Sequence, residues 1–218
     1  MKKKKPDNRP RVPKETIDKT VDHLKKGHTL ILPMDGYYYL CCDAQDIEAV
    51  EKTLGLVTSN EAIFYEVLVD KDHVLERYVE QVPDPAWNII DTSKRPVTLV
   101  LDKPKNIAPA LILEDNSTPF KITYDRFTAL VTSKLRSPLL IASSNFLKGN
   151  MPEKLEDISQ SLIDQVDSII SIEDTTEKIE VHPLEKEAQK GSNKQRQRHQ
   201  PTSIIKISNN GTFKIIRK

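Results

Sequence analysis

The 218-residue sequence lacks the long apolar runs that cross a membrane, and it contains only two cysteines. No stretch approaches about 18 apolar residues, and no apolar signal segment follows the basic N-terminus, so we expect a cytoplasmic protein without membrane contact. Cys41 and Cys42 are adjacent, and adjacent cysteines can neither close a loop nor supply a four-ligand metal site. They predict small buried thiols in a reducing compartment.

Metal-ligand spacing and internal repeats are also missing. The five histidines show no ligand spacing, so we predict no structural zinc at His23, His28, His73, His182 or His199. Without repeats, a chain of this length favours a single domain of about 150 to 200 residues with tails.

The formal net charge of +1 conceals two basic segments. Residues 1–13 read as a basic tail, and residues 14–218 as one domain with a charged insertion at about 173–200 that we expect to be mobile. Basic arms attract polyanions such as RNA, and solvated tails without a partner are the alternative. The candidate RNA contacts in the insertion are Lys194, Arg196 and Arg198.

Helical and strand patterns alternate along the chain. Helical spacing predicts helices over residues 15–26, 46–55, 73–82, 127–135 and 152–166, and a short helix from Pro85. Apolar and β-branched runs predict strands over residues 29–32, 62–69, 97–101, 120–123, 138–142 and 167–172, and a closing hairpin over 201–217. This alternation favours an α/β fold, and the hairpin favours a mixed sheet.

Residues 28–44 hold the first candidate site. Leu30 to Leu32 read as a buried strand that Pro33 should end, followed by a loop with Asp35 and the tyrosines 37–39. Ligands of open α/β sheets bind outside the carboxyl ends of the strands, where this loop would lie. Alternatively, the tyrosines cover a core edge and Asp35 bonds its own turn backbone.

Four segments, in order over residues 14–217, resemble the YrdC/YciO family, whose best-known members are the threonylcarbamoyl-AMP synthases of tRNA modification. They are the strand and loop PMDGYYYL from Pro33, the RPVT before an apolar strand, the Ser-x-Asn at residues 143–145, and the closing hairpin from PTSII to Arg217. Their order carries the resemblance, since no single motif is specific. Around residues 200–202 the sequence is more similar to the YciO branch.

The resemblance implies a twisted mixed parallel and antiparallel sheet with flanking helices and a concave basic cavity. It also implies nucleotide- or substrate-binding roles for Asp35, Tyr38, Lys121, Ser143, Asn145, Thr202, Ser203 and Arg217. Lys94 and Arg95, near the expected mouth of the cavity, are further candidates for phosphate or RNA contact. Ser143 and Asn145 could equally serve a strand-to-loop transition, and Arg217 could be a solvated edge cation.

Departures from the family pattern predict weakened or lost synthase activity. The family's Lys-x-Arg phosphate grip should fall in residues 54–60, which hold no cation. Met34 and Gly36 replace hydroxyl residues, Tyr39 replaces a small residue where the amino acid would lie, and Lys121 lacks the planar fork of arginine.

We therefore expect a divergent domain that binds RNA, either tRNA or duplex RNA, or a nucleotide. One alternative is an active synthase that condenses L-threonine, bicarbonate and ATP, with magnesium as the companion of ATP. The other is a protein-interaction module with the tyrosines as anchors.

Overall fold

The computed structural model describes residues 11–57, 65–93, 96–142, 152–175 and 202–217. The helices are α1 (Lys14–Lys25), α2 (Ile47–Gly55), α3 (Asp84–Thr92), α4 (Arg126–Leu135) and α5 (Gln160–Ile163), with short 3-10 helices η1 (Asp72–Arg77), η2 (Pro109–Leu111), η3 (Leu155–Asp157) and η4 (Glu173–Thr175). The strands are β1 (Leu30–Met34), β2 (Tyr37–Asp43), β3 (Tyr65–Val69), β4 (Val97–Asp102), β5 (Ser117–Ile122), β6 (Leu139–Ala142), β7 (Ser168–Ile169), β8 (Ser203–Ile207) and β9 (Phe213–Arg217).

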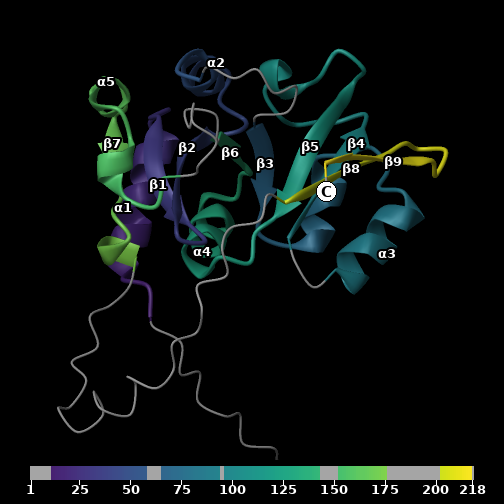
Figure 1. Cartoon of the computed structure of the whole chain (residues 1–218), viewed down its shortest axis with the longest axis horizontal. Helices are drawn as coiled ribbons and strands as arrows, with labels where there is room; N and C mark the ends of the chain where they lie inside the picture. The colour runs from purple at the N-terminus through teal and green to yellow at the C-terminus, as the bar shows by residue number, and fades with distance from the viewer. Residues whose placement is uncertain (1–10, 58–64, 94–95, 143–151, 176–201, 218) are drawn as a thin grey trace, which may run out of the picture.

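The described strands form one sheet of nine in the order β7-β1-β2-β6-β3-β5-β4-β8-β9. Figure 1 shows them side by side, from β7 at one edge to β9 at the other. The pairs β1–β7, β3–β5 and β4–β8 are parallel, and the other neighbours are antiparallel. The predicted mixed α/β sheet with flanking helices is therefore confirmed.

Helices cover both faces of the sheet because alternate strand residues point to opposite sides. On the first face, α1 and α4 bury Leu24 and Val131 against Leu32 and Leu139; we call this the α4 face. On the second, called the α2 face, Val50 of α2 and Ala86 of α3 pack in the core that contains Val67, Phe120 and Leu140. In the described part of the chain, no helix has the length and apolar character needed to span a bilayer.

The prediction that Pro33 ends the first strand was wrong. β1 continues to Met34, and the tyrosines lie in β2, with Pro33 opposite Tyr38. The Tyr38 N–H donates away from β1 to the Pro152 carbonyl at 2.9 Å. Pro33 and Tyr38 are therefore a non-hydrogen-bonded pair, in which the missing N–H of proline costs no ladder bond between β1 and β2.

A two-residue turn joins β1 to β2. Asp35 and Gly36 have φ of 53° and 87°, and two positive φ values are what a type I′ hairpin turn requires. The Asp–Gly pair is itself a strong sequence signal for such a hairpin, and it shows that the tyrosines begin a strand.

Two predicted helices are shorter than expected. Of residues 73–82, only 73–77 are helical, as part of the 3-10 helix η1, and residues 152–166 contain only the short helices η3 and α5. Ser159 between them is extended, with ψ of 138°. The Asp157 carboxylate accepts the N–H groups of Glu153 and Lys154, and such local bonds compete with a continuous helix. The strand predicted at 167–172 is reduced to β7.

Most other predicted elements are confirmed, including α1, α4, the Asp46 cap of α2 and the closing hairpin. The strand predicted over residues 62–69 is confirmed as β3 from Tyr65 to Val69, and residues 62–64 lie outside the described residues. The basic tail and the insertion lie outside them except for residues 11–13 and 173–175, so both stay predictions.

Cys41 and Cys42 are buried and form no disulfide. Burial raises the pKa of the Cys41 thiol well above its usual value and that of Cys42 to about 12. Neither thiol is therefore a nucleophile at neutral pH.

Candidate functional site

Lys121 of β5 lies at the centre of a buried polar cluster on the α4 face. Its Nζ is 3.4 Å from Oε2 of Glu66 in β3, and the Thr98 hydroxyl of β4 donates to the other Glu66 oxygen. The side chains of Lys121 and Glu66 are only 4% and 14% exposed. The cation that stands where the resemblance puts an arginine is thus neutralised by a carboxylate of the protein itself.

Strand register assembles this cluster. Lys121 is opposite Leu68 in β3 and opposite Thr98 in β4. Glu66 is two residues before Leu68, so period-two alternation turns Glu66 and Leu68 to the same face. Glu66, in an otherwise apolar strand, had no predicted role, and only the register reveals its contact with Lys121.

Tyr39 of β2 lies on the same face and is 4% exposed. It packs in the core that contains Met34 and Leu68. Burial raises the pKa of its hydroxyl, and the negative charge of Glu66 adds to the effect. The side chain therefore occupies buried space on the same face of the sheet as Glu66, as a neutral group.

Tyr38 points to the opposite face and is 3% exposed. Its hydroxyl accepts the Ile172 N–H at 3.2 Å, and burial raises its pKa. Asp35 is exposed in the hairpin turn. The structure therefore does not bring Tyr38 to Lys121, and it holds Asp35 in left-handed backbone geometry.

Three predicted residues meet at the open end of the closing hairpin. Arg217 Nε donates to the Thr202 carbonyl at 3.3 Å, and Ser203 pairs with Val97 at the start of β4. Arg217 of β9 pairs with Ile204 of β8, and Ile204 pairs with Thr98 of β4. Thr98 in turn pairs with Lys121 of β5. One row across the sheet thus joins Lys121 to Arg217 over three strand spacings, roughly 14 Å of backbone separation.

Other predicted site residues lie outside the described residues. They are Ser143, Asn145, Lys94, Arg95, Lys194, Arg196 and Arg198. The predicted concave cavity and its Ser-x-Asn contacts therefore stay predictions.

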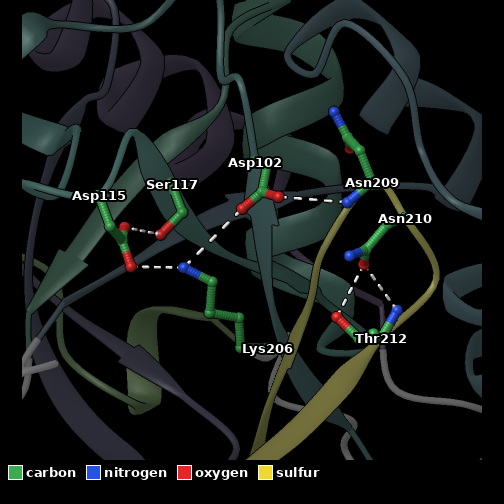
Figure 2. Close-up of polar contacts among 7 residues, drawn as sticks. All are labelled: Asp102, Asp115, Ser117, Lys206, Asn209, Asn210 and Thr212. Atoms are coloured by element: carbon green, nitrogen blue, oxygen red, sulfur yellow. Dashed lines mark hydrogen bonds and ion pairs between the residues drawn. The ribbon is translucent and has the colours of Figure 1, made fainter.

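A second lysine of the same face is also neutralised, as Figure 2 shows. Lys206 of β8 bonds the Asp115 carboxylate and lies 3.8 Å from that of Asp102. The Asn209 N–H donates to Asp102 at 3.2 Å, and the Ser117 hydroxyl donates to Asp115. These bonds fix the closing hairpin to β4 and to the loop before β5.

The Asp115–Lys206 pair predicts a pH-dependent contribution to stability. Hydrogen bonds from Lys206 and Ser117 hold the pKa of Asp115 below its usual value of 3.8. A depressed folded-state pKa stabilises the fold above the unfolded pKa, and this stabilisation is lost as pH falls through the folded value. Asp115→Asn should therefore lower the melting temperature at pH 7, and this difference should close below about pH 4, as calorimetry across the range would measure.

Glu114→Gln is the matched control, because Glu114 is an exposed neighbour of Asp115. Its melting temperature should follow that of the wild type at every pH. A difference for Asp115→Asn that does not shrink at any pH below about 4 would contradict the assigned pairing.

The structure also brings together two histidines that the sequence did not connect. The Nδ1 atoms of His23 and His28 are 2.9 Å apart. Because such a bond needs one donor and one acceptor, at least one ring is neutral. Burial lowers the pKa of His23, and His28 lowers it further. Among the described residues, no cluster of three or more metal-ligating side chains is found.

Solved structures share this arrangement of a mixed sheet between helices. YciO of E. coli matches with a TM-score of 0.72 at 19% identity, over 96% of this chain and 92% of that one. Sua5 of P. abyssi complexed with L-threonine matches with a TM-score of 0.67 at 15% identity, over 90% of this chain and 52% of that one. The fold therefore defines an α/β protein of the YrdC type.

Sequence comparison agrees. The Sua5/YciO/YrdC family model, described as "Telomere recombination", matches residues 22–181. The carbamoyltransferase HypF of Synechocystis sp. is 26% identical over 174 residues, which is 77% of this chain and 20% of that protein. The chain thus spans a fifth of that relative and about half of the P. abyssi Sua5 chain. The chain belongs to the Sua5/YciO/YrdC family, as its motifs predicted.

Proposed function

We propose that this chain is a divergent YrdC-like domain that binds RNA (tRNA or duplex RNA) or a nucleotide, and that its threonylcarbamoyl-AMP synthase activity is weakened or lost. The observation that carries the loss of activity is the buried ion pair between Lys121 and Glu66.

A triphosphate needs cations that are free to face it as pyrophosphate leaves. Lys121 is bonded to Glu66, and Lys206 lies between two carboxylates. A nucleotide whose phosphate bound Lys121 would leave the Glu66 carboxylate without its partner cation. An unpaired charge in a site shielded from water has a high free-energy cost. Residues 54–60 add no cation to offset this.

Tyr39 also supports weakened or lost synthase activity, because it bears on the space available for the substrate L-threonine. The resemblance puts a small residue at this position, and the tyrosine is almost fully buried on the same face of the sheet as Glu66. Its volume is therefore unavailable to L-threonine unless the side chain moves.

Binding of an anionic ligand is supported by charge and by relatives. The basic tail and the cations of the insertion can contact phosphates without a preformed pocket. A HypF structure of similar fold, with a TM-score of 0.60, is described as phosphate- and nucleotide-bound. An active L-threonylcarbamoyladenylate synthase in tRNA t6A modification is the second candidate, and the similarity to Sua5 complexed with L-threonine favours it.

A pyrophosphate-release assay with ATP, magnesium, L-threonine and bicarbonate separates the two candidates. We expect release no faster than in the blank without threonine. Threonine- and bicarbonate-dependent release that Arg217→Ala abolishes would establish the synthase and overturn the proposed loss of activity.

The RNA half is tested by fluorescence anisotropy with tRNA and duplex RNA over a salt series. We expect affinity to fall with salt, and the slope of log K against log salt to become shallower when Lys2 to Lys5 are changed to glutamine. The matched control places the same charge change on exposed positions of α1 and its C-cap, at Lys14, Lys19, Lys25 and Lys26. No binding at low salt would end the RNA proposal.

A further inference from the structure

A small pocket lies at the end of the sheet where β3 stops and β6 begins. Its volume is about 150 Å³, and its walls come from the end of β3, η1, the last turn of α4 and the residues before β6. Asp43 pairs with Leu139 at this end of the sheet, whereas Leu40 pairs with Ala142 at the other. The pocket is therefore at the opposite end of β6 from Ala142.

Cations dominate the lining of this pocket. Lys71, Arg77 and Arg136 border it together with His73, and Asp70 is the acidic residue of the lining. The Asp70 carboxylate is 4.0 Å from Lys71 Nζ. In the ranges that the structure describes, neither Arg77 nor Arg136 forms an ion pair. Arg77 and Arg136, which lie far apart in the sequence, thus border one cavity whose acidic lining residue, Asp70, lies 4.0 Å from Lys71.

Hydroxyl-bearing residues complete the lining, among them Tyr78 and Ser133. Guanidinium groups and hydroxyls are the donors that tetrahedral phosphoryl oxygens accept, and arginine binds such oxygens through two parallel bonds. The carbonyls at the end of α4 carry partial negative charge, which the cations have to outweigh. The lining contains two arginines and a lysine but one carboxylate, so its positive charge outweighs the partial negative charge of the carbonyls.

The backbone of Arg136 adds an independent observation. This residue caps α4 with φ of 63°, and its N–H donates to the Thr132 carbonyl. Left-handed backbone at a helix C-terminus is usually taken by glycine, because other residues are strained there. At Arg136 this conformation is adopted by an arginine that borders the pocket.

We propose that this pocket binds a phosphoryl group, held by Arg77 and Arg136 with Lys71. A volume of about 150 Å³ is well below the roughly 300 Å³ at which pockets for drug-sized ligands begin. The ligand is therefore a small phosphate anion or a single phosphate of a larger molecule such as RNA. This site is separate from the Lys121 cluster and does not depend on the function proposed above.

Calorimetric titration with inorganic phosphate and with pyrophosphate, at constant ionic strength set by chloride, tests the site in the full chain. We expect saturable binding by the wild type, and an affinity at least about tenfold lower in Arg77→Gln and in Arg136→Gly. Arg136→Gly is expected to fold, because glycine takes a φ of 63° without strain. Lys25→Gln, an exposed α1 position with the same charge change, should bind as the wild type does.

A short duplex RNA as competitor identifies the source of the phosphate. Displacement of pyrophosphate by the RNA, with the same loss in both arginine variants, assigns an RNA phosphate to the pocket. Pyrophosphate binding that the RNA leaves unchanged assigns a small anion. Absence of binding at millimolar phosphate, or equal affinity in the wild type and both arginine variants, overturns the proposal.

Discussion

Glu66→Gln should lower the free energy of unfolding by about 3 kcal/mol, because it leaves the Lys121 ammonium buried without its counter-charge. Lys121 is 4% exposed, so water cannot replace the lost counter-charge in the folded chain. Glutamine keeps the volume of glutamate, and its side-chain oxygen can still accept the Thr98 hydroxyl bond. For a chain of this size the melting temperature should fall by roughly 6 to 12 °C, as measured by calorimetry.

Two further variants isolate the ion pair. Glu51→Gln removes the same charge from an exposed position of α2 and should stay within about 0.5 kcal/mol of the wild type. Glu66→Gln combined with Lys121→Met should cost clearly less than the sum of the two single changes, because the double variant has no unpaired charge. Strict additivity in urea denaturation would show that the two side chains do not interact.

Tyr39→Ala should cost about 3 to 5 kcal/mol, the range for deleting a buried aromatic ring. The side chain packs with Met34 and Leu68 in the core shared by α1 and α4, and the rigid strands on either side cannot close over the void. Urea denaturation measures the loss. Tyr39→Phe keeps the ring, so it should cost a small fraction of that amount.

The same pair of variants tests whether Tyr39 fills the space for an amino acid. L-threonine should raise the melting temperature of Tyr39→Ala and leave that of the wild type and of Tyr39→Phe unchanged, since only a vacated site can gain a ligand. Equal stabilisation of all three proteins by threonine would show that the tyrosine does not block the amino acid.

Local signals in the sequence were sufficient for the fold class, the family and most elements. The apolar faces of α1 and α4, the Asp46 cap and the closing hairpin were predicted because each depends on residues close together in the chain. The β1–β2 hairpin was missed although its Asp–Gly signal was present, because Pro33 was taken as a strand end. The continuous helix predicted over residues 152–166 does not form. The hydrogen bonds that the Asp157 carboxylate accepts from nearby backbone N–H groups outweigh the helical spacing of the apolar residues.

Of the candidate site, the sequence alone determined that residues 54–60, where the family resemblance implies a phosphate grip, hold no cation, and that Tyr39 stands where the resemblance implies a smaller residue. Only the tertiary structure decided what became of Lys121, since its partner Glu66 lies in another strand and no local pattern encodes strand register. The same holds for Arg77 and Arg136, which border one pocket because η1 follows β3 and α4 precedes β6, two strands that are neighbours in the sheet. Contacts between residues distant in sequence are set by how strands pair and helices pack, and that is why the chemistry of both sites became visible only in the folded chain.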